Sequence, residues 1–235
     1  MNWTGKVFAY CERGLDPSFW AEPLNAASNL AFFAAALAGF VLWLAQPRDK
    51  RGWPELMLVL VVVAIGTGSF LFHTTATKWA AVADTVPIGI FMVAYLIYAV
   101  RRFAGFPWWG VGIAAVLFVA TLPPSSMVRC GGGPCYNGSV AYLPALAALA
   151  IVGVGLWRRA HPAAPALLAG AGIFAASLVF RTVDRTLCPY TILAAAGSVG
   201  THFVWHMLNG LLLYLLVRAA ILYGRPAERV RIAVA

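Results

Sequence analysis

Three of the four histidines in the chain belong to one group of polar residues, which lie in or beside strongly apolar segments. The group consists of Ser69, His73, Asp84, His202 and His206. Because an ionisable group is costly inside a bilayer, such a group usually marks a functional site. Three imidazoles, a carboxylate and a hydroxyl are the components of a metal hydrolase site, in which three protein ligands leave one position for water. The residue types therefore predict metal-assisted hydrolysis.

The spacing of these residues predicts that they meet at one depth. Ser69 and His73 are four residues apart and share a helix face, as do His202 and His206. We expect the three histidines to bind zinc, Asp84 to accept or orient the proton of the attacking water, and Ser69 to hydrogen-bond the oxyanion. The alternative for any single histidine is a structural hydrogen bond between helices. Imidazole also suits iron, copper and nickel, so the spacing does not identify the metal.

The composition and the apolar segments predict the helices that position this group of residues. Hydrophobic residues make up 62% of the 235 residues and charged residues 11%, whereas soluble domains carry about 25% charged residues. A membrane span needs about 20 apolar residues, and seven segments qualify: 24–45, 55–73, 82–100, 107–123, 140–157, 165–183 and 196–223. The expected fold class is all-α, a polytopic membrane protein whose single seven-helix domain covers residues 1–235. Residues 1–23 form an acidic N-terminal segment and residues 224–235 a basic tail.

Basic residues predict the orientation in the membrane. Eleven of the 17 Lys and Arg residues follow the first, third, fifth and seventh spans, and six lie on the other side. The positive-inside rule therefore places the N-terminus outside, the C-terminus in the cytoplasm and the histidine group toward the non-cytoplasmic side. The net charge of +9 is mostly this topological signal. Because the basic residues are scattered over separate loops, no nucleic-acid partner is expected, and no obligate protein partner is implied.

The four cysteines all fall in connections assigned to the outer side. An even number in a non-reducing compartment suggests two disulfides, for which three pairings exist. Cys130 and Cys135 enclose a short Gly-Gly-Gly-Pro stretch and are expected to form a local bridge. Cys11 would then pair with Cys188 and tie the N-terminal segment to the loop before the seventh span. The alternative is four free thiols.

Three other polar residues are not expected to take part in the chemistry. Arg181 and Asp184 lie three residues apart at the end of the sixth span and are expected to pair with each other, and the alternative is that Asp184 braces the N-terminal segment or the loop. The fourth histidine, His161, lies beside Pro162 in a predicted cytoplasmic loop and is expected to be exposed.

Three motifs of the chain resemble a known family. They are Gly-Ser-Phe-Leu-Phe-His at 68–73, Asp-Thr-Val-Pro at 84–87 and His-Phe-Val-Trp-His-Met-Leu-Asn-Gly at 202–210. In this order and spacing they resemble the alkaline ceramidases, seven-span hydrolases of the CREST membrane superfamily. The resemblance extends to Cys11, to Ser28-Asn29-Leu30 and to Asp184 with Cys188, and so covers most of the chain.

The resemblance implies an enzyme of sphingolipid metabolism. It assigns zinc to His73, His202 and His206, places Ser69 and Asp84 in the catalytic site, and implies a membrane lipid substrate of the ceramide class, cut at its amide into a fatty acid and a sphingoid base. It also implies the disulfide between the N-terminal segment and the loop before the seventh span. Two alternatives remain open: a lipid receptor or sensor with a structural zinc site, and a hydrolase of another lipid ester or amide.

The acidic N-terminal segment suggests a second metal. Glu12, Asp16 and Glu22 supply hard oxygen ligands of the kind that suit Ca²⁺, and the alkaline ceramidases bind calcium in this region. The match is imperfect, because Ala9 and Gly14 stand where the family often has side-chain oxygen donors. We expect calcium at the three carboxylates, and the alternative is a solvated acidic loop.

Overall fold

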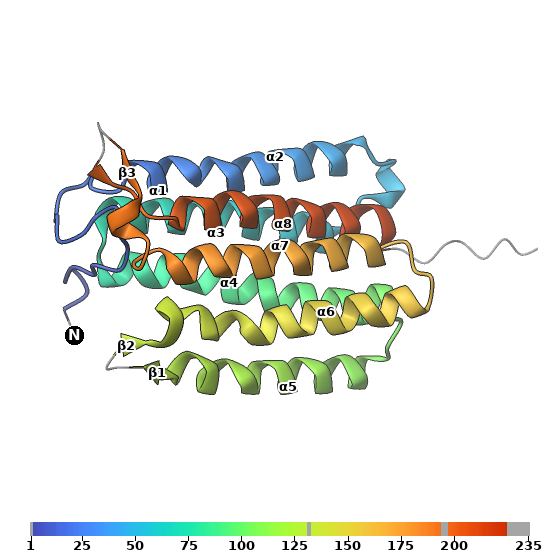
Figure 1. Ribbon diagram of the computed structural model, residues 1–235. Helices are drawn as coiled ribbons and strands as arrows, with labels where there is room; N and C mark the ends of the chain where they lie inside the picture. The colour runs from blue at the N-terminus through green and yellow to red at the C-terminus, as the bar shows by residue number, and fades with distance from the viewer. Residues whose placement is uncertain (1, 131–132, 194–196, 225–235) are drawn as a thin grey trace, which may run out of the picture.

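The computed structural model describes residues 2–130, 133–193 and 197–224, which form one bundle of long helices (Figure 1). The helices are α1 (Pro23–Ser28), α2 (Leu30–Ala45), η1 (Arg48–Lys50), α3 (Trp53–Thr75), α4 (Lys78–Tyr98), η2 (Ala99–Phe103), α5 (Trp108–Met127), η3 (Cys135–Tyr142), α6 (Leu143–Arg158), α7 (Ala164–Val183), η4 (Cys188–Tyr190) and α8 (His202–Tyr223). Two short antiparallel hairpins complete the fold: β1 (Arg129–Cys130) with β2 (Gly133–Pro134), and β3 (Ile192–Leu193) with β4 (Gly197–Ser198).

The predicted fold class is confirmed. Within the described residues, seven helical segments are long and apolar enough to cross a membrane, and the chain is an integral multi-pass membrane protein. The orientation of the termini stays a prediction. Of the predicted basic tail, residues 225–235 lie outside the described part of the chain. The two spans with the largest buried share are α3 and α8, which carry the three histidines of the site.

The last span begins later than its sequence predicts. The predominantly apolar segment 196–223 predicts one long span, yet α8 starts only at His202, after the β3–β4 hairpin. Gly200 has φ +65°, a left-handed conformation that a helix cannot continue and that favours glycine. A Cβ at Gly200 would also collide with the side chains of Asp184 and Cys11. His202 therefore lies in the first turn of its helix.

Glycines set the closest helix contacts beside the site. A Cβ at Gly68 on α3 would overlap the backbone carbonyl of Ala83 on α4, and a Cβ at Gly210 on α8 would lie 2.7 Å from Cβ of Ala31 on α2. Small residues allow helix backbones to approach in this way in membrane proteins. The two contacts bring α3 against α4 and α8 against α2 at the level of the polar residues.

One end of the bundle gathers the N-terminal segment and both hairpins, at the left of Figure 1. A disulfide joins Cys11 to Cys188 with a Cα–Cα distance of 5.6 Å, and a second joins Cys130 to Cys135. No free cysteine is found among the described residues. The first disulfide holds the N-terminal segment over the start of α8.

Candidate metal centre

The three histidines converge at this end of the bundle. The ring centroid of His73 lies 5.1 Å from that of His202 and 4.7 Å from that of His206, and the rings of His202 and His206 are 4.6 Å apart. All three side chains are 0–1% exposed. The last turns of α3 and the first two turns of α8 deliver them from opposite directions along the bundle.

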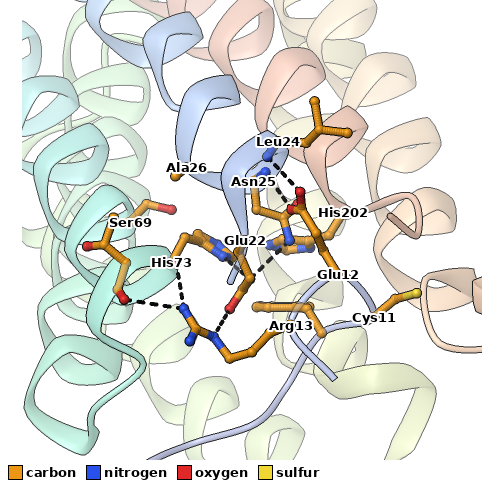
Figure 2. Close-up of polar contacts among 12 residues, drawn as sticks. Cys11, Glu12, Arg13, Glu22, Leu24, Asn25, Ala26, Ser69, His73 and His202 are labelled. Carbon is orange, nitrogen blue, oxygen red and sulfur yellow. Dashed lines mark hydrogen bonds and ion pairs between the residues drawn. The ribbon is translucent and has the colours of Figure 1, made fainter. Parts of the chain in front are cut away.

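A carboxylate fixes the proton position on His73. Nδ1 of His73 lies 2.5 Å from Oε2 of Glu22, the residue just before α1 (Figure 2). Burial alone would raise the pKa of Glu22, but the hydrogen bonds that its carboxylate accepts from His73, Arg13 and Asn25 hold that pKa below its usual value. An ionised carboxylate only accepts, so Nδ1 carries the proton and Nε2 keeps a free lone pair. This Nε2 is buried and has no partner in the protein.

A hydroxyl fixes the proton position on His206 by a similar constraint. Ser28 Oγ lies 2.7 Å from Nδ1 of His206 and 2.9 Å from the carbonyl oxygen of Asn25. The hydroxyl has one proton, and the carbonyl can only accept it, so Nδ1 of His206 must donate to Ser28. The lone pair of His206 is therefore on Nε2, as it is on His73.

His202 is held by its ring and by its backbone. Its imidazole stacks on the phenol ring of Tyr10 with a centroid distance of 3.6 Å and an interplanar angle of 17°. The backbone N–H groups of Thr201 and His202 donate to Oδ1 of Asp184 at 2.7 and 2.9 Å, which satisfies the start of α8. Nδ1 of His202 is buried without a protein partner.

These histidines fit a metal ion. Each offers one nitrogen, and the three nitrogens lie within 4.8 Å of one another. Buried imidazole nitrogens without partners are rare because an unsatisfied polar atom is costly, and His73 and His202 each have one. Outer partners such as Glu22 and Ser28 are typical of histidines that bind metals. The triad could therefore hold a metal ion, whose identity the geometry leaves open.

Ser69 and Asp84 reach the triad from neighbouring helices. Ser69 on α3 is buried, and its Oγ lies 3.4 Å from Nε2 of His206, the nitrogen with the free lone pair. Asp84 on α4 lies near Ser69 and near the guanidinium of Arg181, and its backbone lies against Gly68. The two oxygen-bearing side chains that the sequence singled out thus lie beside the three nitrogens.

The three carboxylates predicted to bind calcium do not form a metal-ligating cluster among the described residues. Both oxygens of Glu12 accept backbone N–H groups, from Leu24 at 2.7 Å and Asn25 at 2.8 Å (Figure 2). Asp16 is exposed and accepts from the backbone of Ser18. Glu22 is bound to Arg13, His73 and Asn25. An arginine side chain therefore lies among the oxygens of the predicted calcium site.

The predicted pair between Arg181 and Asp184 is wrong, and the alternative, in which Asp184 braces the N-terminal segment, is confirmed. Asp184 instead accepts from the backbone N–H of Cys11 at 3.0 Å and from the two residues that begin α8, and so ties the N-terminal segment to α7 and α8. Arg181 donates to the hydroxyl of Tyr10 at 2.8 Å, and its guanidinium lies 5.3 Å from the ring centroids of Tyr142 and Trp205. The carboxylate of Asp184 accepts from backbone donors because the N–H groups of Cys11, Thr201 and His202 all face it.

An apolar cavity continues from the site into the bundle. Its lining includes Ile65, Ile88 and Asn209. Each of these lies one helical turn farther into the membrane than Ser69, Asp84 and His206 respectively, on the same helices. Aromatic and aliphatic side chains form the remaining wall, among them Phe32, Phe91, Met92, Phe174 and Leu213. The cavity therefore begins where the polar site ends.

Sequence reasoning alone missed several contributors to the site. Ser28 belongs to a motif of the resembled family, but its contact with a histidine is not predicted. Arg13 and Tyr10 have no periodicity or spacing that predicts a role at the site. A buried role for Arg13 could have been suspected from its place between Glu12 and Glu22 in a short segment anchored by a cysteine, but no local pattern predicts which carboxylate it contacts.

Comparison with known proteins agrees with the geometry. A family model described as Ceramidase matches residues 8–228, from the N-terminal segment through all seven spans and every residue of the site. No curated protein matches the sequence significantly.

Proposed function

The chain belongs to the ceramidase family, and from that membership we propose that it is a zinc-dependent amidase of the membrane that hydrolyses ceramide-like lipids. Family membership supports a ceramide-hydrolysing membrane enzyme. The finer proposal is that water cleaves the amide bond, so that the acyl group leaves as a fatty acid and the amine as a sphingoid base.

His73, His202 and His206 would hold the metal. Bound zinc would polarise the amide carbonyl and lower the pKa of water at the site. Glu22 and Ser28 support this assignment, because they hold the Nδ1 protons of His73 and His206 and leave each Nε2 lone pair free.

Asp84 is the proposed proton carrier. Its carboxylate would take a proton from the attacking water and pass it to the amide nitrogen, which must be protonated to leave as an amine. Ser69 would donate its hydroxyl proton to the oxygen that gains negative charge during the attack. The proximity of Asp84 to Ser69 and the contact of Ser69 with His206 support both roles.

The apolar cavity is the observation that carries the choice of a lipid substrate. It starts one turn below Ser69, Asp84 and His206 and is walled by apolar side chains. A long acyl chain placed there would bring its amide to the polar residues. Because the wall of the pocket is apolar, affinity would come from apolar contact and orientation from the few polar groups at its mouth.

The site is proposed to face the non-cytoplasmic side. Its end of the bundle is opposite the loops that carry Arg48, Lys50, Arg51, Arg101, Arg102, Arg158 and Arg159. These basic loops would lie in the cytoplasm by the positive-inside rule.

The function is tested with the full chain purified in detergent. Ceramide turnover, followed by mass spectrometry of the released fatty acid, should stop in a strong chelator and return with added zinc. His206→Ala should lose both bound zinc and turnover, whereas His161→Ala should keep both. A lipid screen that includes esters and other amides tests the substrate class. Undiminished turnover by His206→Ala in metal-free buffer would contradict the proposal.

A further inference from the structure

Arg13 is buried under the N-terminal segment, and every N–H group of its guanidinium donates a hydrogen bond. The residue is 3% exposed, and the guanidinium makes five hydrogen bonds. Its Nε lies 2.5 Å from Oε1 of Glu22, and Nη1 donates to the carbonyl oxygens of Asp16 and Ser18 at 3.0 and 2.7 Å. Nη2 donates to the carbonyl oxygens of His73 and Thr74 at 2.8 and 3.3 Å. A guanidinium has five N–H donors, so no donor remains free.

The oxygens around Arg13 are those of a cation site. One carboxylate and four backbone carbonyls converge on it, the same classes of ligand that a hard divalent cation uses. Two of the carbonyls, those of His73 and Thr74, belong to the last turn of α3, where carbonyl groups lack helical partners and carry partial negative charge. The helix ends at Ala76, which has φ 47°. The guanidinium therefore caps α3 and neutralises Glu22 at once (Figure 2).

The carboxylates expected to bind calcium do not fit a calcium ion in this arrangement. Each oxygen of Glu12 already accepts a backbone N–H group at the start of α1, and each oxygen of Glu22 already accepts at least one side-chain donor. The carbonyls of Asp16 and Ser18 point to Arg13. A divalent cation would have to displace a guanidinium that forms a buried ion pair and four hydrogen bonds.

We infer that Arg13 is the built-in cation of this segment, and that the protein needs no calcium ion to order the N-terminal segment over the site. The Arg13 side chain replaces a bound divalent ion structurally. It links residues 13–22 to the end of α3 and to the carboxylate of Glu22, which hydrogen-bonds His73.

Arg13 is also a positioning residue for the metal centre, a role that rests on the proposed function. Its Nε and the Nδ1 of His73 hold opposite oxygens of Glu22, so the carboxylate bridges the two groups. Without the guanidinium, Glu22 would be a buried carboxylate with no compensating charge beside it. The Glu22 carboxylate would then no longer be held against Nδ1 of His73. The direction in which Nε2 of His73 points would no longer be fixed either.

The first experiment tests the cation assignment and is independent of hydrolysis. Full-length protein in detergent is equilibrated with radioactive calcium, and its melting temperature is compared in EGTA and in millimolar Ca²⁺. We expect no stoichiometric calcium binding and no shift in melting temperature. Binding of one calcium per chain, or a lower melting temperature in EGTA, would overturn the assignment even if no variant folds.

The second experiment tests positioning through a spectroscopic signature. Cobalt is loaded in place of zinc, and its visible absorption is compared for the wild type, Arg13→Ala, Arg13→Gln and Arg185→Ala, the last being an exposed arginine at the same end of the bundle. We expect an altered cobalt spectrum and an affinity lower by about 10–100-fold for the Arg13 variants alone. Arg13→Gln keeps much of the side-chain volume and serves if Arg13→Ala does not fold.

The outcomes separate the two proposals. A wild-type spectrum and affinity in Arg13→Gln would overturn the positioning role. Failure of the wild type itself to bind cobalt or zinc would instead contradict the proposed metal site and leave the calcium result standing on its own measurement.

Discussion

Ser28 and His206 are 178 positions apart in the chain, and their side chains meet at 2.7 Å. Because Ser28 gives its only proton to the carbonyl of Asn25, it must accept the Nδ1 proton of His206. The last residue of α1 thus determines which nitrogen of a histidine on α8 has a free lone pair.

Ser28→Ala is expected to lower zinc affinity by about 10–100-fold, because outer hydrogen-bond partners of metal ligands have effects of this size. Turnover at saturating zinc should change much less, since all three histidines remain. Competition with a metal chelator measures the affinity. Ser126→Ala, which removes an exposed hydroxyl bonded to its own helix, is the matched control. Equal affinities in the two variants would contradict the role of Ser28.

Ser69→Ala and Asp84→Asn are expected to lose turnover while keeping zinc. The losses in kcat should be about 10²–10³-fold for the hydroxyl and about 10²–10⁴-fold for the carboxylate. Metal analysis of the purified variants, beside fatty-acid release, separates catalysis from metal binding. Loss of zinc in parallel with activity would show instead that these side chains hold the metal.

Gly68→Ala is expected to push α3 away from α4. The added Cβ meets the carbonyl of Ala83, which is rigid backbone, so the helices must separate beside Ser69 and Asp84. Overpacking of this kind costs about 1–3 kcal/mol, and activity should fall because Ser69 and Asp84 move apart. Gly112→Ala on α5, where a Cβ meets nothing within 4 Å, is the control. Thermal unfolding and turnover are measured for both, and similar results would exclude the steric explanation.

Met92→Trp is expected to shorten the acyl chains that the enzyme accepts. Met92 lines the apolar cavity from α4, and a larger ring there should lower kcat/KM for long-chain ceramides by on the order of 10-fold while leaving short-chain substrates unaffected. Val86→Trp changes an exposed side chain of the same helix and serves as the control. A uniform loss over all chain lengths would argue that the cavity does not hold the acyl chain.

His161 should make stability depend on pH at the opposite end of the bundle. The sequence suggested an exposed residue, but His161 is half-buried, lies with its ring 5.4 Å from that of Phe103, and accepts the backbone N–H of Ala163 through Nδ1. Burial lowers the pKa of His161 below its usual value of 6.5. The unfolded chain therefore takes up a proton at a higher pH than the folded protein does, so this stabilisation is complete above about pH 6.5 and declines as the pH falls.

The matching experiment compares the melting temperatures of the wild type and His161→Gln between about pH 7.5 and pH 5.5. The melting temperature of the wild type should fall further on acidification than that of the variant. Release of metal from the distant triad affects both proteins alike and cancels in the difference. If the difference in melting temperature between the two proteins stays constant over this pH range, protonation of His161 does not affect stability and the prediction is contradicted.

Local patterns were sufficient for much of the fold. Long apolar runs predicted seven spans, since length and hydropathy are properties of each segment by itself. They did not predict the late start of α8, because hydropathy alone does not separate Gly197–Ser198 of the hairpin from the apolar helix that follows. The pairing of Arg181 with Asp184 failed for the same reason: three residues of spacing allow an ion pair, but the backbone donors of two other segments compete for the carboxylate.

The sequence by itself determined that three histidines, a serine and an aspartate lie near span ends, because the four-residue spacing of a helix and the length of a span are fixed by local geometry. The tertiary structure decided which nitrogen of His73 and of His206 is free, since Glu22 and Ser28 reach them across 51 and 178 residues. It also placed Arg13 among the oxygens where a metal was expected. Such contacts arise between irregular segments and helix ends, where only the packing of the whole bundle sets the distance between a donor and its acceptor.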